Sequence, residues 1–126
     1  MGQFNVFQKN NLITGTHLAV EITSSFPNHR AFVVIGSYEK TLKGHARPSS
    51  ILNRDYSDLR FWFRQYEVDE KFIGSNEDIS VEQLANHVFK KDIDSLEHLE
   101  NELEVYLQDF SLLKPVWRFD PKLPFN

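Results

Sequence analysis

Cysteine is absent from this chain of 126 residues, which excludes a disulfide scaffold, thiol catalysis and any metal site built on cysteine. Long hydrophobic runs are missing too, because the longest, Ala31–Ile35, is far shorter than the roughly 20 residues that cross a bilayer. The N-terminus lacks the basic, apolar and small-residue order of an export signal. We therefore expect a soluble cytoplasmic protein with no membrane partner.

Motifs of common enzyme sites are also missing. The five glycines are too scattered to form a phosphate-binding loop, and there is no nucleophile elbow or dinucleotide-binding fingerprint. No two of the five histidines stand at the i, i+4 spacing of a helical zinc site. We therefore predict no catalytic residue, no metal and no cofactor.

Aromatic residues, by contrast, are abundant, with 11 Phe, 4 Tyr and 2 Trp in the chain. Hydrophobic residues make up 40% of the sequence and charged residues 25%, as in ordinary globular proteins. This composition is enough to build the core of a single domain spanning residues 1–126.

The first part of this domain, residues 1–50, is rich in β-forming residues. Residues 12–23 contain many Thr and branched aliphatic residues, and their apolar residues alternate from Leu18 onwards. A turn at 24–28 separates them from a second apolar run at 29–36, which predicts an antiparallel hairpin.

Two neighbouring stretches carry weaker patterns. Phe4 and Val6 indicate a short leading strand before the hairpin. Residues 39–55 form a polar connection that contains Lys43 and Arg47 and has the composition of a basic loop.

The segment 56–68 fits two kinds of structure. Leu59, Phe61 and Phe63 alternate with the residues between them, as in a strand. Large apolar residues also recur at helical spacing across the segment, and Asp58 is suited to a helix N-terminus. We favour a short helix here, with a strand as the alternative.

Two further helices are expected after this segment. Ser80 and Gln83 form a capping box before residues 81–89, whose apolar residues fall on one helical face. A second helix begins in the same manner at residues 94–97, and its apolar stripe extends to Phe110.

These segments together predict an α+β fold, in which a small antiparallel N-terminal sheet is followed by two or three C-terminal helices. The domain is then β-rich over 1–50 and helical over 56–112. Residues 114–126 contain three prolines and cannot form a helix. We expect them to form an extended tail, held by its aromatic rings or paired as an edge strand.

Charge is unevenly distributed along the chain. Residues 1–66 contain eight basic and four acidic residues, whereas residues 67–126 contain six basic and fourteen acidic residues. The segment 92–109 has seven acidic residues and no Lys or Arg. Such a surface repels the phosphates of nucleic acids and attracts a basic partner, although a solvated helix face is the simpler alternative.

The acidic segment is poorly arranged for helix stability alone. Glu100 and Glu104 are like charges at i, i+4, and Asp109 lies at the end of the expected helix that disfavours negative charge. A role in binding explains this cost. The acidic segment also contains uncharged residues that could form the centre of a contact, with the acids around them. These residues are Asn101, Val105 and Gln108.

The run Tyr56-Ser57-Asp58-Leu59 is followed by Phe63, Tyr66 and Asp69, then by the helix expected at Ser80 and the acidic helix that ends at residues 103–107. Over residues 56–107 this order resembles one family of immunity proteins from bacterial contact-dependent growth-inhibition systems. Ser57 stands where that family usually has Pro.

The resemblance implies a small cytoplasmic inhibitor that binds a toxin domain, often a nuclease, and blocks its active site or substrate surface without catalysis. The partner would be a basic toxin domain bound by a monomer in a 1:1 complex, with no nucleic acid or membrane involved. Carboxylates of this chain would then pair with Lys and Arg of the toxin in place of substrate phosphates. The resemblance places these carboxylates first at Glu97, Glu100, Glu104 and Asp109, with a second patch at Asp69 and Glu70.

Two other functions stay open. The basic region 40–64, together with His29 or His45, could serve a small metal-independent RNA-binding protein or ribonuclease. Alternatively, Val105, Trp62 or the aromatic residues of the tail could be buried against a second copy of the chain.

Overall fold

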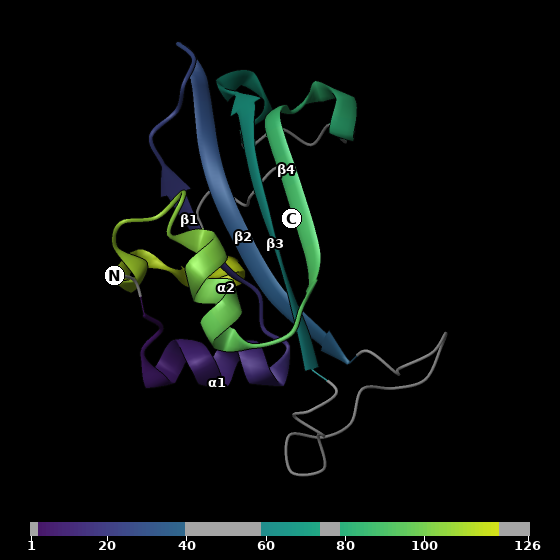
Figure 1. The fold of residues 1–126 in the computed structure, drawn as a ribbon. Helices are drawn as coiled ribbons and strands as arrows, with labels where there is room; N and C mark the ends of the chain where they lie inside the picture. Colours follow the sequence, from purple (N-terminus) through teal and green to yellow (C-terminus); the bar gives the residue numbers. More distant parts are fainter. Residues whose placement is uncertain (1–2, 40–58, 74–78, 119–126) are drawn as a thin grey trace.

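The computed structural model describes residues 3–39, 59–73 and 79–118. Within them, a five-stranded antiparallel sheet in the order β4-β3-β2-β1-β5 carries two α-helices on one face (Figure 1). The elements are α1 (Val6–Thr14), β1 (Leu18–Ile22), β2 (His29–Glu39), β3 (Leu59–Asp69), β4 (Ala85–Ile93), α2 (Leu96–Leu103) and β5 (Lys114–Pro115). Short 3₁₀ turns lie at Glu70–Phe72, Val81–Gln83, Phe110–Leu112 and Val116–Arg118.

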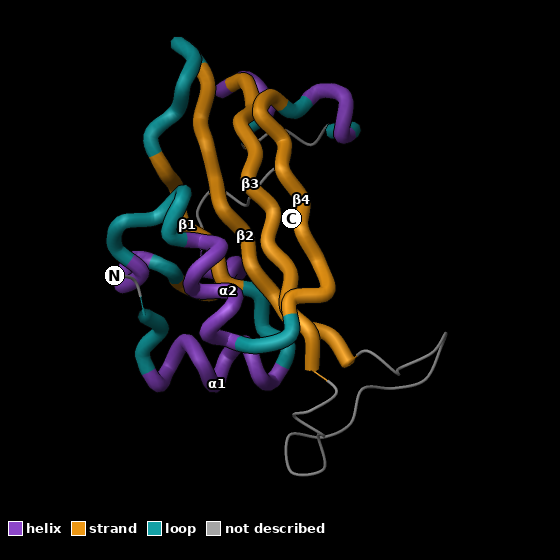
Figure 2. The backbone as a smooth tube through the Cα atoms, in the orientation of Figure 1, coloured by secondary structure: helices purple, strands orange, loops and turns teal. Residues whose placement is uncertain are grey.

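The α+β class and the hairpin of β1 and β2 are confirmed, with Leu18 opposite Ile35 and Ile22 opposite Ala31. The predicted first strand begins too early, because residues 12–14 form the end of α1. The division into an N-terminal sheet and C-terminal helices is wrong. The helix α1 comes first in the chain, and the strand β5 still follows α2. Figure 2 shows α1 and α2 together beside the strands of the sheet.

The helix α1 replaces the strand that was expected near the N-terminus. The Asn5 side chain accepts a hydrogen bond from the Gln8 amide at 2.8 Å, and the Gln8 side chain accepts one from the Asn5 amide at 3.0 Å. This capping box starts the helix, and Gly15 ends it with a φ of 93°, which favours glycine. The side chain of Gln8 is buried and also donates to the Phe110 and Leu113 carbonyls, which ties α1 to the chain after α2.

The helix favoured for residues 56–68 is wrong over the described part of that segment, which forms β3. All eleven residues of β3 pair with the eleven residues of β2, from His29 opposite Asp69 to Glu39 opposite Leu59. Leu59, Phe61 and Phe63 are buried on the helix side of the sheet, as the strand alternative requires.

The helix expected over residues 81–89 is also wrong. The Ser80 amide donates to the Gln83 side chain at 2.8 Å, but this cap starts a single 3₁₀ turn. The chain then enters β4, where Gln65 of β3 lies opposite Val88 and Phe63 lies opposite Lys90. Pairing with β3 therefore takes precedence over the helical spacing of the apolar residues.

The acidic helix is present but shorter than expected. Ser95 caps α2 by accepting a hydrogen bond from the His98 amide at 3.0 Å, and the helix ends at Leu103. The later residues of its predicted stripe, Leu107 and Phe110, leave the helix and still enter the same core.

The start of the C-terminal tail forms an edge strand, β5, and a 3₁₀ turn follows it. Lys114 and Pro115 pair with Ala19 and Leu18 of β1. The expected basic loop at 39–55 and the last residues of the tail, 119–126, lie largely or wholly outside the described residues.

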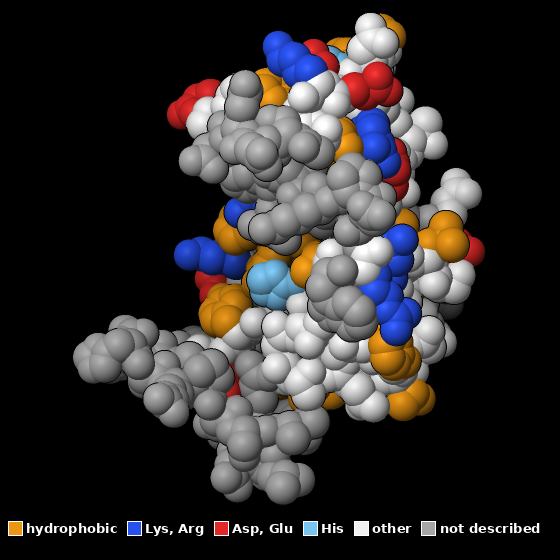
Figure 3. Space-filling view, turned by 180° about the vertical axis from the view of Figure 1, so that it is seen from behind, with side chains coloured by type: hydrophobic (Ala, Val, Ile, Leu, Met, Phe, Trp, Pro, Cys, Tyr) orange, Lys and Arg blue, Asp and Glu red, His pale blue; other side chains and the backbone are white. Residues whose placement is uncertain are grey.

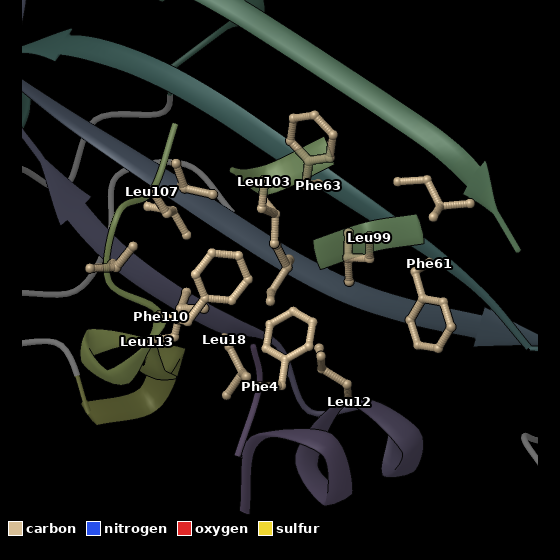
Figure 4. Packing of buried hydrophobic residues seen from close by; sticks show 14 of the residues in the cluster. Phe4, Leu12, Leu18, Phe61, Phe63, Leu99, Leu103, Leu107, Phe110 and Leu113 are labelled. Carbon is tan, nitrogen blue, oxygen red and sulfur yellow. The ribbon is translucent and has the colours of Figure 1, made fainter. Parts of the chain in front are cut away.

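The main core lies between the helices and the sheet. Leu12 of α1 and Leu99 and Leu103 of α2 point towards the large side chains of the strands (Figure 4). A smaller cluster lies on the opposite face of the sheet, where Phe32 and Tyr66 pack beside Val34 and Val68. The middle of β2 is therefore buried on both faces of the sheet, and both helices lie on one of them.

Candidate functional site

Four of the residues predicted to bind a partner lie together along α2 and its C-cap. Glu97, Glu100, Asn101 and Glu104, which we call the acidic face, line a hollow of about 380 Å³ with Gln3, Lys9 and Leu96. In the described part of the chain, no Lys or Arg forms an ion pair with any of the three carboxylates.

Other acids of segment 92–109 have partners within the protein. Asp92 accepts a hydrogen bond from the Tyr38 hydroxyl. Glu102 pairs with Lys90 at 2.8 Å and lies 3.4 Å from the His98 ring. The hydrogen bond from Lys90 holds the pKa of Glu102 below its usual range. Although the segment has no Lys or Arg, a lysine of the neighbouring strand therefore supplies a partner.

Glu100 differs from the other carboxylates of the acidic face. It accepts a hydrogen bond from the main-chain amide of Phe4 at 2.8 Å. Phe4 itself is buried in the main core, so this bond holds the chain before α1 against α2. Glu97 and Glu104 have no such role among the described residues and are the cleaner candidates for binding.

The remaining predicted residues of this region continue past the helix. Val105 directly follows the acidic face and is 79% exposed. Gln108 and Asp109 line a different hollow, of about 410 Å³, against residues of β1. Asp109 caps the next 3₁₀ turn by accepting from the Ser111 amide at 2.9 Å. The nine predicted residues therefore do not form one continuous surface.

Asp69 and Glu70 stand apart from the acidic face. Ile93, which leads into α2, lies opposite Phe61, and Asp69 is eight residues further along β3. At about 3.3 Å per residue, Asp69 therefore lies roughly 26 Å along β3 from Phe61, which marks the place where the chain leads into α2. The Asp69 side chain accepts from the Lys71 amide at 3.0 Å, and the Glu70 amide donates to the Asn28 carbonyl. These two hydrogen bonds hold the turn that follows β3 and join it to the turn before β2.

A second candidate site, which sequence reasoning missed, lies on the sheet face away from the helices. It is a groove of about 450 Å³ that we call the sheet groove, and it is lined by His17, Tyr38, Trp62, Arg64, Phe89, Lys91 and Asp92. Figure 3 views this face and shows a histidine and hydrophobic side chains gathered in its middle, with Lys and Arg side chains on either side.

The sheet groove depends on the strand character of β3 and β4. Because residues of a strand alternate between faces, Trp62 and Arg64 point away from the helices, while Phe61 and Phe63 enter the main core. The alternation of residues 59–64 was the available signal, and the preference for a helix concealed it.

The charges of the sheet groove are held by specific contacts. The Arg64 guanidinium lies over the Phe89 ring, 4.6 Å from its centroid, and its Nη1 is 2.6 Å from Nε2 of His87. Burial and the Arg64 charge both lower the pKa of His87, which favours the neutral ring that can accept from Arg64. Burial likewise lowers the pKa of His17.

Comparisons with known proteins add no relative: no family model matches the chain, and neither the curated proteins nor the solved structures give a match. Among the described residues, no group of three or more His, Cys, Asp or Glu side chains is placed to hold a metal ion. Neither α-helix of the described chain has the length and apolar character needed to cross a membrane.

Proposed function

We propose that this protein is a toxin-neutralising immunity protein, which binds a basic toxin domain through the acidic face and blocks its active site or substrate surface. It acts in the cytoplasm without catalysis, as a monomer in a 1:1 complex. The observation that carries the proposal is that Glu97 and Glu104 project from one side of α2 with no Lys or Arg ion pair among the described residues.

The support beneath α2 favours this role. Leu99 and Leu103 are fully buried against the sheet, and Ser95 caps the helix. The carboxylates of the acidic face therefore extend from a fixed backbone, so less conformational entropy is lost when a partner binds.

An exposed apolar residue completes the surface. Val105 lies one residue after Glu104 and is 79% exposed. In protein interfaces an apolar centre with a charged rim is common, because the centre excludes water and the charges set orientation and speed of encounter. The local sequence thus offers both parts of such an interface.

The test is a charge reversal of the acidic face without Glu100, whose bond to Phe4 would add a folding defect. The proposal predicts a gene for a basic toxin domain immediately upstream of the gene for this protein. Association of the Glu97→Lys/Glu104→Lys variant with that domain, inactivated at its active site, is measured by stopped flow at several salt concentrations. We expect association to slow by about tenfold or more at low salt, with a weaker salt dependence than the native protein shows.

The matched control compares the single variants Glu97→Lys and Glu82→Lys, because Glu82 is an exposed carboxylate before β4 that is not among the residues predicted to bind the partner. If both single variants slow association alike, the effect comes from overall charge, and the acidic face is not the contact. If Glu97→Lys/Glu104→Lys binds as the native protein does, the proposed function fails.

A further inference from the structure

The sheet groove combines aromatic rings with cations, on the face of the sheet opposite to α2. The His17 and Trp62 rings meet edge to face with centroids 4.9 Å apart, and Trp62 lies 6.0 Å from Phe89. One continuous row of rings therefore crosses the sheet, from the segment before β1 through β3 to β4.

Gly36 of β2 makes room for this row. A Cβ placed there would lie 2.7 Å from both a carbon of His17 and a carbon of Trp62. The two rings thus lie directly over the β2 backbone, where any larger residue would displace them. The rings keep partly accessible surface, and Phe89 is 45% exposed.

The polar groups of the groove are suited to an anion beside a ring. Arg64 is a planar donor, and Lys91 adds a second cation to the groove lining. The Asp92 carboxylate also lines the groove and accepts from the Tyr38 hydroxyl. The two cations outnumber this carboxylate, so the described lining is net positive in a chain whose formal net charge is −4.

We propose that the sheet groove binds a nucleotide unit, whose base stacks on Trp62 and Phe89 and whose phosphate is held by Arg64 and Lys91. Aromatic rings stack on any base, and Arg and Lys are the usual phosphate ligands. The groove volume of about 450 Å³ lies within the range of about 300–1,000 Å³ of small-molecule sites. A free mononucleotide and one unit of a single-stranded RNA share this chemistry.

Two neighbouring lysines of β4 provide a matched test. Lys91 lines the sheet groove, whereas Lys90 lies on the other face and pairs with Glu102. Both are exposed, so Lys91→Gln and Lys90→Gln remove the same charge from adjacent positions of the folded full-length chain. Binding of AMP and UMP is measured by calorimetry, and binding of a labelled single-stranded hexaribonucleotide by fluorescence anisotropy, at several salt concentrations.

We expect Lys91→Gln to weaken binding, while Lys90→Gln binds as the native protein does. For the RNA, the slope of the logarithm of the binding constant against the logarithm of salt concentration should become less steep by about one in Lys91→Gln. Trp62→Leu removes the stacking ring, and we expect binding at least about fivefold weaker. Thermal unfolding of each variant verifies its fold. Saturable binding of AMP or UMP identifies a free nucleotide as the ligand, and binding of the hexaribonucleotide alone identifies single-stranded RNA.

The inference is overturned if neither probe binds at millimolar concentration, or if Lys90→Gln and Lys91→Gln weaken binding equally. Preferential binding of an acidic aromatic peptide over both nucleotide probes also overturns it. The acidic face lies on the other side of the sheet, so Glu97→Lys/Glu104→Lys should leave nucleotide binding in place, and the two proposals can fail separately.

Discussion

The main-chain amide of Phe4 donates a hydrogen bond to the Glu100 carboxylate at 2.8 Å, between residues 96 positions apart in the sequence. We expect Glu100→Ala to lower the free energy of unfolding by about 1–3 kcal/mol, because a partly buried amide loses a charged acceptor. Glu97→Ala, one turn earlier on the same helix, should cost no more than about 0.5 kcal/mol. Urea unfolding of both variants provides the measurement, and equal losses would show that the bond to Phe4 contributes little.

Glu67 is the most buried acidic residue of the described chain, with 2% of its surface exposed. It accepts from the Ser25 amide at 2.6 Å, from the Ser24 hydroxyl at 3.0 Å and from the Asn86 side chain. Burial raises the pKa of Glu67, but these hydrogen bonds outweigh burial and hold the pKa below its ordinary value of 4.5. The ionised carboxylate therefore joins β3 to the turn after β1 and to the start of β4.

Because its pKa is lowered in the folded state, Glu67 stabilises the protein above pH 4.5, and this stability is lost as pH falls through the folded pKa. We expect Glu67→Gln to cost about 1–3 kcal/mol at neutral pH, and the difference from the native protein to shrink as the pH falls below 4.5. Urea unfolding at a series of pH values measures both effects. Parallel pH profiles would contradict this role.

Gly36 has no space for a side chain, because a Cβ would lie 2.7 Å from atoms of His17 and Trp62. We expect Gly36→Ala to destabilise the protein by about 1–3 kcal/mol and to change the tryptophan fluorescence. The cost should fall in a Trp62→Leu background, since one of the two obstructing rings is then removed. An unchanged cost in that background would show that Trp62 does not limit the space.

Local patterns predicted those elements whose partners are close in sequence. The hairpin of β1 and β2 needs only a short turn, and α2 has both a serine cap and an apolar stripe. The segments of β3 and β4 were interpreted wrongly because their spacing fits a helix as well as a strand. The long strand β2 decides between the two, since its eleven residues pair along all of β3, and β3 in turn pairs with β4.

The same limit applies to the candidate sites. Helical spacing predicts that Glu97, Asn101 and Glu104 point away from the apolar stripe of the acidic helix, and together with Glu100 they line one hollow beside α2. It could not reveal that Phe4 binds Glu100 or that Lys90 binds Glu102, because these contacts depend on tertiary packing. The sheet groove requires three strands in register, so its residues become neighbours only in the folded chain.

The outer side of β4 has no further strand beside it among the described residues. It carries Lys90 and Lys91, its pairing with β3 has two register shifts, and Asn86 and Asp92 have positive φ angles. Adjacent lysines and such irregularities oppose the addition of another copy, because they repel it and interrupt a flat row of amides and carbonyls. These features disfavour edge-to-edge pairing along β4, although this strand also exposes Val88 and Phe89.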